Sequence, residues 1–331
     1  MSARVALVGA GQVTRLVAPR LRDRGHELVA VIGRGAAVGR DVGELAGLNP
    51  VGIAVRGDLA GALAETRPDV VLMSTASTLA ATESALVACI TAGAHVISAG
   101  EELLAPWASD PARAESIDAL ARAHGVSVLA SGHVDALWVH LPLALTGIVT
   151  RLDRLEGTCT RPFAAARSSN AGVAALLGRP AADYPVEHDD APGSGAAFSS
   201  LQAIARGLGL TVTGARATLG PAVREGDAVA LLPHGERAIP AGTIAGSART
   251  VELETAEGIA LVLHDLARIG DHSTEHWRVT GTPDVELRAS ATQGLVSTAT
   301  QMIARIDTAL AASPGLHTLS DLPPLRFSPA G

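Results

Sequence analysis

The stretch Arg4-Val5-Ala6-Leu7-Val8-Gly9-Ala10-Gly11-Gln12-Val13-Thr14 decides the fold. Its first half is an apolar run of strand length, and its second half opens a helical pattern that continues to Arg24. The turn between them has the form GxGxx, with Thr14 where a third glycine is common. The first glycine permits a tight turn, and the second lets the backbone approach a pyrophosphate at the helix N-terminus. The larger Thr14 is expected to loosen the helix-to-strand contact. The turn predicts a dinucleotide site made by Gly9, Gly11, Gln12 and Val13.

Short apolar runs alternate with amphipathic stretches over residues 1–130, which is typical of parallel βαβ units. The strand candidates are 4–8, 27–32, 69–74, 95–99 and 127–129, and the helix candidates are 13–24, 59–66, 79–92 and 111–124. The class predicted is α/β, with a Rossmann doubly wound parallel sheet as the dinucleotide-binding domain.

A different pattern follows Ser131. A buried helix is expected at 137–149, then β-branched or alternating runs at 151–160, 216–223, 250–255, 259–267, 276–279 and 285–289. Such runs predict a mixed or antiparallel sheet, so residues 131–290 are expected to form an α+β substrate and dimerisation domain. The Gly- and Pro-rich stretch 178–195 is expected to be a mobile loop. Residues 291–331 are expected to form a C-terminal helix and tail that pack back on the Rossmann domain.

Composition narrows the function. The net charge is −7 and the basic residues are scattered, so no nucleic-acid-binding stripe is visible. There is neither a signal peptide nor a membrane span, which favours a cytoplasmic protein. All 26 basic residues are Arg, which excludes a Lys base or Schiff base. Cys89 and Cys159 are expected to be buried thiols, and the His- and Asp-containing runs lack metal-ligand spacing, so no metal is predicted.

The second strand candidate ends Val31-Ile32-Gly33-Arg34, without the acidic residue that binds a ribose hydroxyl. Arg34 and Arg40 can instead meet a 2′-phosphate, which favours NADP(H) over NAD(H), although NAD(H) stays possible. The alternative is that Arg34 is a solvated surface residue. Small residues leaving the third strand at the same sheet edge are expected to border the nicotinamide half of the cofactor; they are Ser74, Thr75 and Ala76.

Two carboxylates, Glu101 and Glu102, directly follow the apolar run at 94–100. If that run is a buried strand, both lie at its carboxyl end, where open α/β sheets bind ligands. The alternative is that both glutamates cap the helix that follows.

Several segments together resemble a known family. They are Gly100-Glu101-Glu102-Leu103 with Pro106-Trp107, and the segments 39–45, 141–146, 280–284 and 319–324. In order and spacing they are similar to the dihydrodipicolinate-reductase-like oxidoreductases, and most similar to the 2,4-diaminopentanoate dehydrogenase and NAD(P)H-dependent amine dehydrogenase group. The resemblance implies hydride transfer between a nicotinamide cofactor and a carbon bearing nitrogen. It implies reductive amination of a small ketone or aldehyde with ammonia, or deamination of an amine, in a homodimer. It places proton transfer on Glu102 first and on Glu101 second.

One segment departs from that group. Where the amine dehydrogenases carry an Asn-Pro-Gly stretch, this chain reads Gly132-His133-Val134-Asp135-Ala136-Leu137-Trp138. His133 can donate a proton or bind a substrate carboxylate, with Asp135 orienting it, or it can be an ordinary loop histidine. Trp107, His133 and Trp138 are expected to shape the substrate pocket. The alternatives are a reductase of a preformed cyclic imine, carbonyl or enone, and a non-catalytic NADP-sensing protein.

Overall fold

The computed structural model describes residues 2–165, 170–190, 192–232 and 235–327. The chain divides into two compact units. Unit 1 contains Met1–His140, Gly193–Gly207 and Leu295–Gly331, and unit 2 contains Leu141–Pro192 and Leu208–Gly294. Segment 193–207, which the sequence analysis assigned to the second domain, therefore belongs to unit 1.

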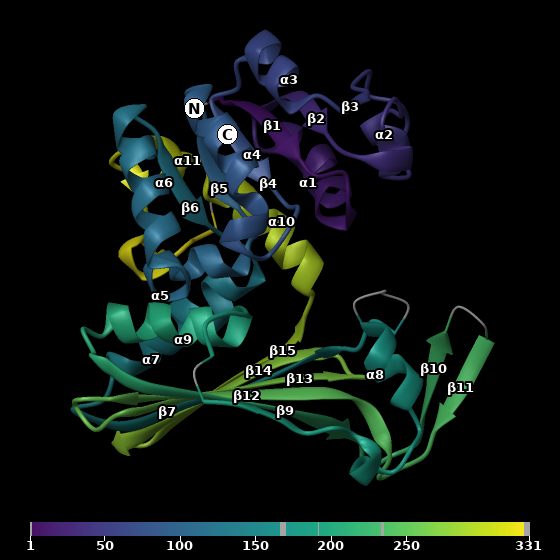
Figure 1. The fold of residues 1–331 in the computed structure, drawn as a ribbon, viewed down its shortest axis with the longest axis vertical. Helices are drawn as coiled ribbons and strands as arrows, with labels where there is room; N and C mark the ends of the chain where they lie inside the picture. Colours follow the sequence, from purple (N-terminus) through teal and green to yellow (C-terminus); the bar gives the residue numbers. More distant parts are fainter. Residues whose placement is uncertain (1, 166–169, 191, 233–234, 328–331) are drawn as a thin grey trace. The chain divides into compact units, whose positions relative to one another are not determined.

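Unit 1 is built on a seven-stranded parallel sheet in the order β16-β6-β5-β4-β1-β2-β3 (Figure 1). The order reverses direction at β1, as expected for a doubly wound sheet. The strands are β1 (Arg4–Val8), β2 (Glu27–Ile32), β3 (Val55–Arg56), β4 (Val70–Met73), β5 (His95–Ser98), β6 (Ser127–Ala130) and β16 (Gly315–Leu316).

The helices of unit 1 begin where the sequence offers polar caps. Thr78 caps α4 (Leu79–Thr91), Asp58 caps α3 (Leu59–Thr66) and Asp110 caps α6 (Pro111–Ala123), each through a side-chain oxygen that accepts a backbone N–H. Helix α1 (Gln12–Asp23) differs, because Gly11 precedes it and no side chain caps it. The remaining elements of this part are α2 (Val42–Leu45), α5 (Pro106–Ser109), the 3₁₀ turns Gly35–Ala37 and Glu101–Leu104, and the π-helix Asp135–His140.

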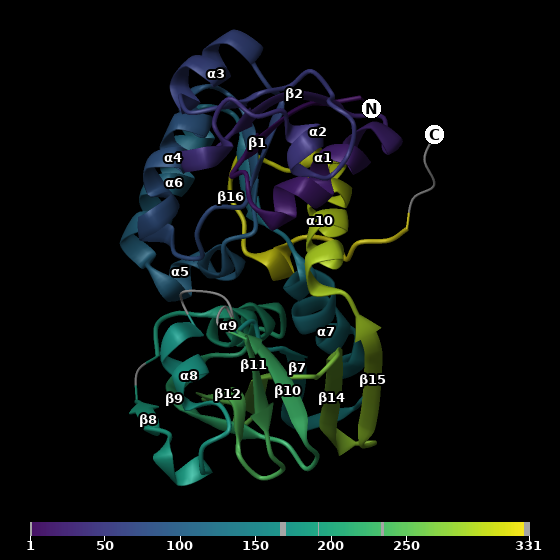
Figure 2. The same cartoon turned by 90° about the vertical axis from the view of Figure 1, so that its right-hand side faces the viewer.

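The C-terminal segment completes unit 1, as the yellow elements in Figure 2 show. Helix α10 (Gly294–Ala304) is followed by α11 (Ile306–Ala311), which packs against β5 and β6. β16 then pairs in parallel with β6, so the last strand in sequence becomes an edge of the sheet. Helix α9 (Ala196–Gly207) packs against the 3₁₀ turn Glu101–Leu104, the π-helix and the 3₁₀ turn Leu319–Asp321.

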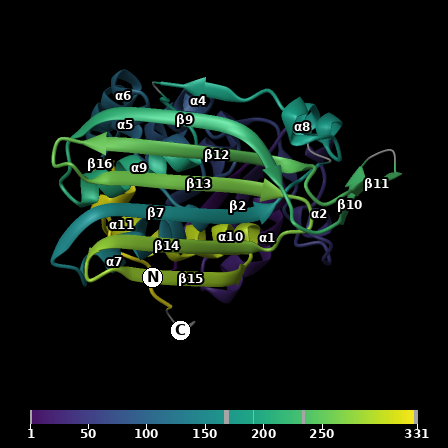
Figure 3. The same ribbon diagram turned by 90° about the horizontal axis from the view of Figure 1, so that it is seen from below.

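Unit 2 contains a mixed seven-stranded sheet in the order β15-β14-β7-β13-β12-β9-β8, most of which Figure 3 shows side by side. β7 and β13 are parallel and the other pairs are antiparallel. The strands are β7 (Arg151–Pro162), β8 (Glu187–Asp189), β9 (Val212–Val223), β12 (Ile244–Thr255), β13 (Ala260–Arg268), β14 (Ser273–Thr282) and β15 (Val285–Thr292). A separate hairpin, β10 (Ala228–Leu232) and β11 (Gly235–Ile239), with helices α7 (Leu141–Thr146) and α8 (Ala171–Leu176), completes the unit.

Two expectations about irregular segments need correction. The helix expected at 137–149 begins at Asp135 with a π-helical turn and ends at Thr146. The stretch 178–195, expected to be a loop, contains a 3₁₀ turn at Ala181–Asp183 and the edge strand β8; Ala191 lies outside the described residues. β8 has three exposed residues, so its sequence lacks the apolar alternation that identifies a strand. No described helix combines the length and the apolar character needed to cross a bilayer.

Candidate active site

The turn after β1 has the geometry that its glycines predict. Gly9 has φ +111°, and a Cβ at this position would lie 2.6 Å from the Ser74 carbonyl oxygen. Only glycine fits both the backbone and the space. Thr14 is 3% exposed, and its hydroxyl donates to the Gly9 carbonyl at 2.6 Å and lies 3.3 Å from Ser74 Oγ. The hydroxyl of Thr14 therefore links the start of α1 to the turn, which the expectation of a looser helix-to-strand contact did not include.

The N-terminus of α1 suits a phosphate. Gly11 is exposed, and a Cβ at this position would meet nothing within 4 Å. No side chain caps α1 and no acidic residue lies in its first turn, so no carboxylate competes for the amide end of the helix dipole. Gln12 and Val13, also predicted to bind the cofactor, open this helix. The described residues fit the pyrophosphate of a dinucleotide.

The loop after β2 presents two exposed arginines beside an aspartate that is engaged in backbone hydrogen bonds. Arg34 and Arg40 are both exposed, and within the described part of the chain neither side chain makes a hydrogen bond or ion pair. Asp41 is the nearest acid, and its carboxylate accepts four backbone N–H groups, from Gly43, Val51, Gly52 and Ile53, at 2.7–3.0 Å. These bonds lower the pKa of Asp41, with the amide of Val51 contributing most. Asp41 is thus occupied within its own loop.

The residues after β4 and β5 lie close together at the carboxyl edge of the sheet. Ser74 continues the ladder by donating its N–H to the Val8 carbonyl, and Glu102 donates its backbone N–H to the Ser77 carbonyl at 3.0 Å. A Cβ at Gly100 would lie 3.1 Å from the Ala76 carbonyl oxygen. The segment that carries Ser74, Thr75 and Ala76 is therefore brought beside the segment that carries the two glutamates.

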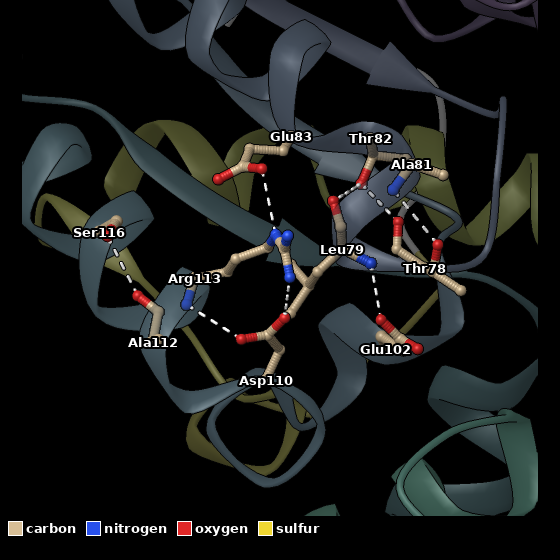
Figure 4. A network of polar contacts seen from close by, with 10 residues as sticks. All are labelled: Thr78, Leu79, Ala81, Thr82, Glu83, Glu102, Asp110, Ala112, Arg113 and Ser116. Carbon is tan, nitrogen blue, oxygen red and sulfur yellow. Dashed lines mark hydrogen bonds and ion pairs between the residues drawn. The ribbon is translucent and has the colours of Figure 1, made fainter.

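Glu102 has one oxygen engaged and one available (Figure 4). Its Oε2 accepts the backbone N–H of Leu79, the first residue of α4, at 2.7 Å. The residue is 9% exposed. Among the described residues, Oε1 has no hydrogen-bond partner. It is not fully buried, so it keeps access to solvent. The alternative that both glutamates cap the following helix needs correction, because α5 has no side-chain cap and Glu102 instead bonds the first residue of α4.

The segment that follows β5 is also attached to α4 at its other end. Arg113 donates to Glu83 of α4 at 3.1 Å and to the Asp110 carboxylate, as Figure 4 shows. This bond to Arg113 holds the pKa of Asp110 below its usual range. Trp107, between these attachments, and Glu101, just before the first, are half-buried. The carboxylate of Glu102 is therefore fixed in position, whereas Glu101 is the more exposed of the two.

The segment after β6 begins beside β5, because Ser131 donates its N–H to the Ser98 carbonyl at 2.9 Å. His133 is half-buried, and its backbone N–H donates to Thr298 Oγ1 at 3.1 Å. Trp138 is 4% exposed, and its indole Nε1 is buried without a hydrogen-bond partner among the described residues. The structure thus brings His133 and Trp138 onto one segment next to the end of β5.

Asp135 does not orient His133, contrary to the sequence-based expectation. Its carboxylate accepts two hydrogen bonds of 2.7 Å from Arg305 and one of 2.9 Å from Ser131 Oγ. His140 Nε2 lies 3.3 Å from the same carboxylate. Burial lowers the pKa of His140, more than Asp135 raises it. The sequence analysis missed Arg305, because nothing in the local pattern distinguishes a buried arginine from a surface one.

No group of three His, Cys, Asp or Glu side chains suited to a metal ion occurs in the described ranges. His276 pairs with Glu286, and Asp271 pairs with Arg224 and Arg268. Cys89 and Cys159 are buried free thiols, and burial raises the pKa of Cys89 to about 12.

Comparisons with known proteins agree with the fold. Residues 3–101 match the family model described as dihydrodipicolinate reductase, N-terminus. The chain is 25% identical over 322 residues to the 2,4-diaminopentanoate dehydrogenase of Acetoanaerobium sticklandii, an alignment that covers 92% of this chain and 88% of the relative. The solved structure of the amine dehydrogenase from Mycobacterium smegmatis matches with a TM-score of 0.86 and 27% identity, over 100% of this chain and 99% of the other.

A more distant structure supports the fold alone. GenD2 from gentamicin A biosynthesis, solved in complex with NAD, has a TM-score of 0.52 and 17% identity, over 88% of this chain and 73% of the other.

The predicted resemblance to dihydrodipicolinate-reductase-like oxidoreductases and the predicted α/β class are confirmed. The chain is an oxidoreductase, and a nicotinamide dinucleotide cofactor is supported.

Proposed function

We propose that this oxidoreductase is an NADPH-dependent amine dehydrogenase that reductively aminates a small ketone or aldehyde. A carbonyl and ammonia condense to an imine and release water. When bound, NADPH would supply the hydride for the imine carbon, and a proton would reach the nitrogen, so that the products would be the amine and NADP⁺. The reverse direction is oxidative deamination. The observation that carries the proposal is the carboxylate of Glu102, fixed by Leu79 through one oxygen and available through the other.

Glu102 is proposed to move the proton. A general acid-base must be oriented, and it must keep one atom within reach of the reacting nitrogen. Leu79 N–H orients the carboxylate by bonding Oε2, which leaves Oε1 to exchange a proton with the imine or amine nitrogen. A carboxylate also stabilises the positive charge of a protonated imine. Glu101, half-buried beside it, is the second candidate.

The preference for NADP(H) rests on the loop after β2. An exposed guanidinium without a partner is suited to a phosphate, to which it can form two hydrogen bonds. Arg34 and Arg40 meet this description, and Asp41 is already saturated by backbone amides. Gly9, Gly11, Gln12 and Val13 would hold the pyrophosphate, and Ser74, Thr75 and Ala76 would border the nicotinamide.

The substrate pocket is proposed to include Trp107, His133 and Trp138. A buried indole N–H without a partner is unfavourable, by about 1–3 kcal/mol, unless water or a ligand accepts its hydrogen. Trp138 is such a donor, so it is suited to a substrate that carries an oxygen acceptor away from the reacting carbon. Homodimerisation stays a prediction, which a measurement of molecular mass in solution tests.

A substrate screen tests the reaction. Purified protein is mixed with NADPH and a panel of small ketones and aldehydes, with and without ammonium, and oxidation of the nicotinamide is followed by absorbance. We expect turnover that requires ammonium and an amine product detected by mass spectrometry. Turnover that is independent of ammonium would instead indicate a carbonyl, enone or cyclic-imine reductase. Dinucleotide binding without turnover of any of these substrates would indicate a sensing protein.

A further inference from the structure

Three residues at the C-terminal end of the chain contact the segment after β6 through one side of a helix. Thr298 and Gln301 lie on α10, and Arg305 follows it immediately. Because they are spaced by three and four residues, their side chains project from the same side of the helical path. All three contact residues 133–136.

The first two supply acceptors to backbone amides. Thr298 Oγ1 accepts the N–H of His133 at 3.1 Å, and Gln301 Oε1 accepts the N–H of Ala136 at 3.0 Å. Two backbone amides, one in the turn before the π-helix and one in its first turn, therefore depend on α10.

Arg305 anchors the same turn through a charge. Its Nε and Nη2 donate to the two oxygens of Asp135 at 2.7 Å each, and both residues are 0% exposed. Its Nη1 donates to the Pro323 carbonyl at 2.5 Å. A buried bidentate ion pair of this kind fixes both distance and orientation.

These contacts determine where the segment lies. Its start is attached to the end of β5 by Ser131, and Gly132 lies against Thr298, since a Cβ there would be 3.5 Å from Thr298 Cγ2. The π-helix also packs against α9 and the 3₁₀ turn Leu319–Asp321, but the hydrogen bonds to His133, Asp135 and Ala136 described above come from α10 and Arg305. Loss of these hydrogen bonds would therefore free the start of the segment, which carries His133 and leads to Trp138.

We infer that Thr298, Gln301 and Arg305 are positioning residues, which place His133 and Trp138 for substrate binding without contacting the substrate themselves. The inference rests on the proposed function, because that proposal makes His133 and Trp138 pocket residues. A misplaced pocket residue weakens substrate binding and alignment, whereas the turn Gly9–Thr14, which binds the dinucleotide, is unaffected.

Thr298→Val tests the inference with little risk to the fold, because valine keeps the shape of threonine and loses only the hydroxyl. We expect KM for the carbonyl substrate to rise about tenfold, while the dissociation constant of NADPH is unchanged. Thr298→Ser keeps the hydroxyl and should restore KM. Thr300→Val, on an exposed position of the same helix, is the matched control and should behave as wild type.

Amide hydrogen exchange of the whole protein provides a readout that does not depend on the reaction. In Thr298→Val the N–H of His133 loses its acceptor, so exchange over residues 132–140 should become faster than in wild type, in Thr298→Ser and in Thr300→Val. Unchanged exchange would overturn the inference. Faster exchange with an unchanged KM, or a raised KM that Thr298→Ser does not restore, would also overturn it. Failure of the proposed function is recognised separately, because the substrate screen then finds no ammonium-dependent turnover. In that case KM is measured with the carbonyl or imine that the protein reduces. If the protein turns over none of these substrates, the exchange result alone decides whether α10 positions this segment.

Discussion

The turn Gly9–Thr14 and the segment Gly132–His140 both follow strands of the same parallel sheet, but they are specified differently. The turn is fixed by a positive φ at Gly9 and by the hydroxyl of Thr14, five residues away. The segment is fixed by Thr298, Gln301 and Arg305, which lie 165–170 residues away in the sequence. The proposed cofactor end of the site is therefore specified largely by local residues, and the proposed substrate end depends on the C-terminal part of the chain.

The largest expected effect is on the distant contacts. Arg305→Met leaves the Asp135 carboxylate buried without its charged partner, so we expect a loss of about 3–5 kcal/mol in the free energy of unfolding. Urea unfolding measures this loss. The double variant Arg305→Met with Asp135→Leu removes both charges and should be less destabilised than the single variant. A single variant as stable as Arg22→Met, at an exposed position of α1, would show that the segment does not depend on this pair.

The next effect concerns the local turn. Gly9→Ala combines an unfavourable φ with a close approach to the Ser74 carbonyl, so we expect a loss of about 1–3 kcal/mol in stability. We also expect dinucleotide binding to weaken about tenfold or more, because distortion of the tight turn displaces the N-terminus of α1 that would receive the pyrophosphate. Gly25→Ala is the control, since Gly25 has φ +75° but a Cβ there meets nothing within 4 Å. It should lose some stability and keep its dinucleotide affinity. Equal affinities in the two variants would contradict a binding role for the turn.

A smaller effect is expected at the end of β2. Arg34→Ala removes an exposed guanidinium, and we expect NADPH to bind about tenfold more weakly while NADH binding is unchanged. Isothermal titration with both nucleotides measures the difference. Arg22→Ala, also exposed, controls for the loss of one positive charge. If Arg34→Ala weakens neither nucleotide, the guanidinium is a solvated surface group.

The smallest effect is a pH dependence in the distant network. The pKa of His140 is lowered by burial, so the folded protein favours the neutral ring. The stabilisation from burying the neutral ring is complete above about pH 6.5, which is the pKa of histidine in the unfolded chain. It is lost as the pH falls below this value. Arg305 Nη2 lies 3.0 Å from His140 Nε2, and a glutamine at this position can also accept a hydrogen bond. The Tm of His140→Gln should therefore fall less than that of wild type between about pH 7 and pH 5. An equal fall in both proteins would show that protonation of His140 does not affect folding.

Features fixed by nearby residues could be predicted from the sequence, and features fixed by distant residues could not. The bounds expected for β1, β2 and α3 agree with the structure, because apolar periodicity and the cap at Asp58 are local signals. The place of Arg34 directly after β2 also follows from the local pattern, whereas its predicted contact with a 2′-phosphate stays a prediction. The partner of Asp135 was not predicted. An ion pair between residues 170 positions apart leaves no trace in the local pattern around either residue.

The two glutamates illustrate the limit within one short segment. Their place at the carboxyl end of β5 follows from the apolar run before them. The direction in which the Glu102 side chain points depends on Leu79, 23 residues earlier. The apolar run before the glutamates does not reveal this contact. The sequence therefore predicted the location of the carboxylates and could not predict which oxygen stays available.

The most direct test of the account compares Glu102→Gln with Glu101→Gln in the ammonium-dependent reaction. Glutamine keeps an oxygen that accepts the Leu79 N–H, so the fold around α4 should persist while the proton-transfer group is removed. We expect kcat of Glu102→Gln to fall about a hundredfold with dinucleotide affinity unchanged, and that of Glu101→Gln to fall much less. A Glu102→Gln enzyme that reduces the imine as fast as wild type would contradict the account.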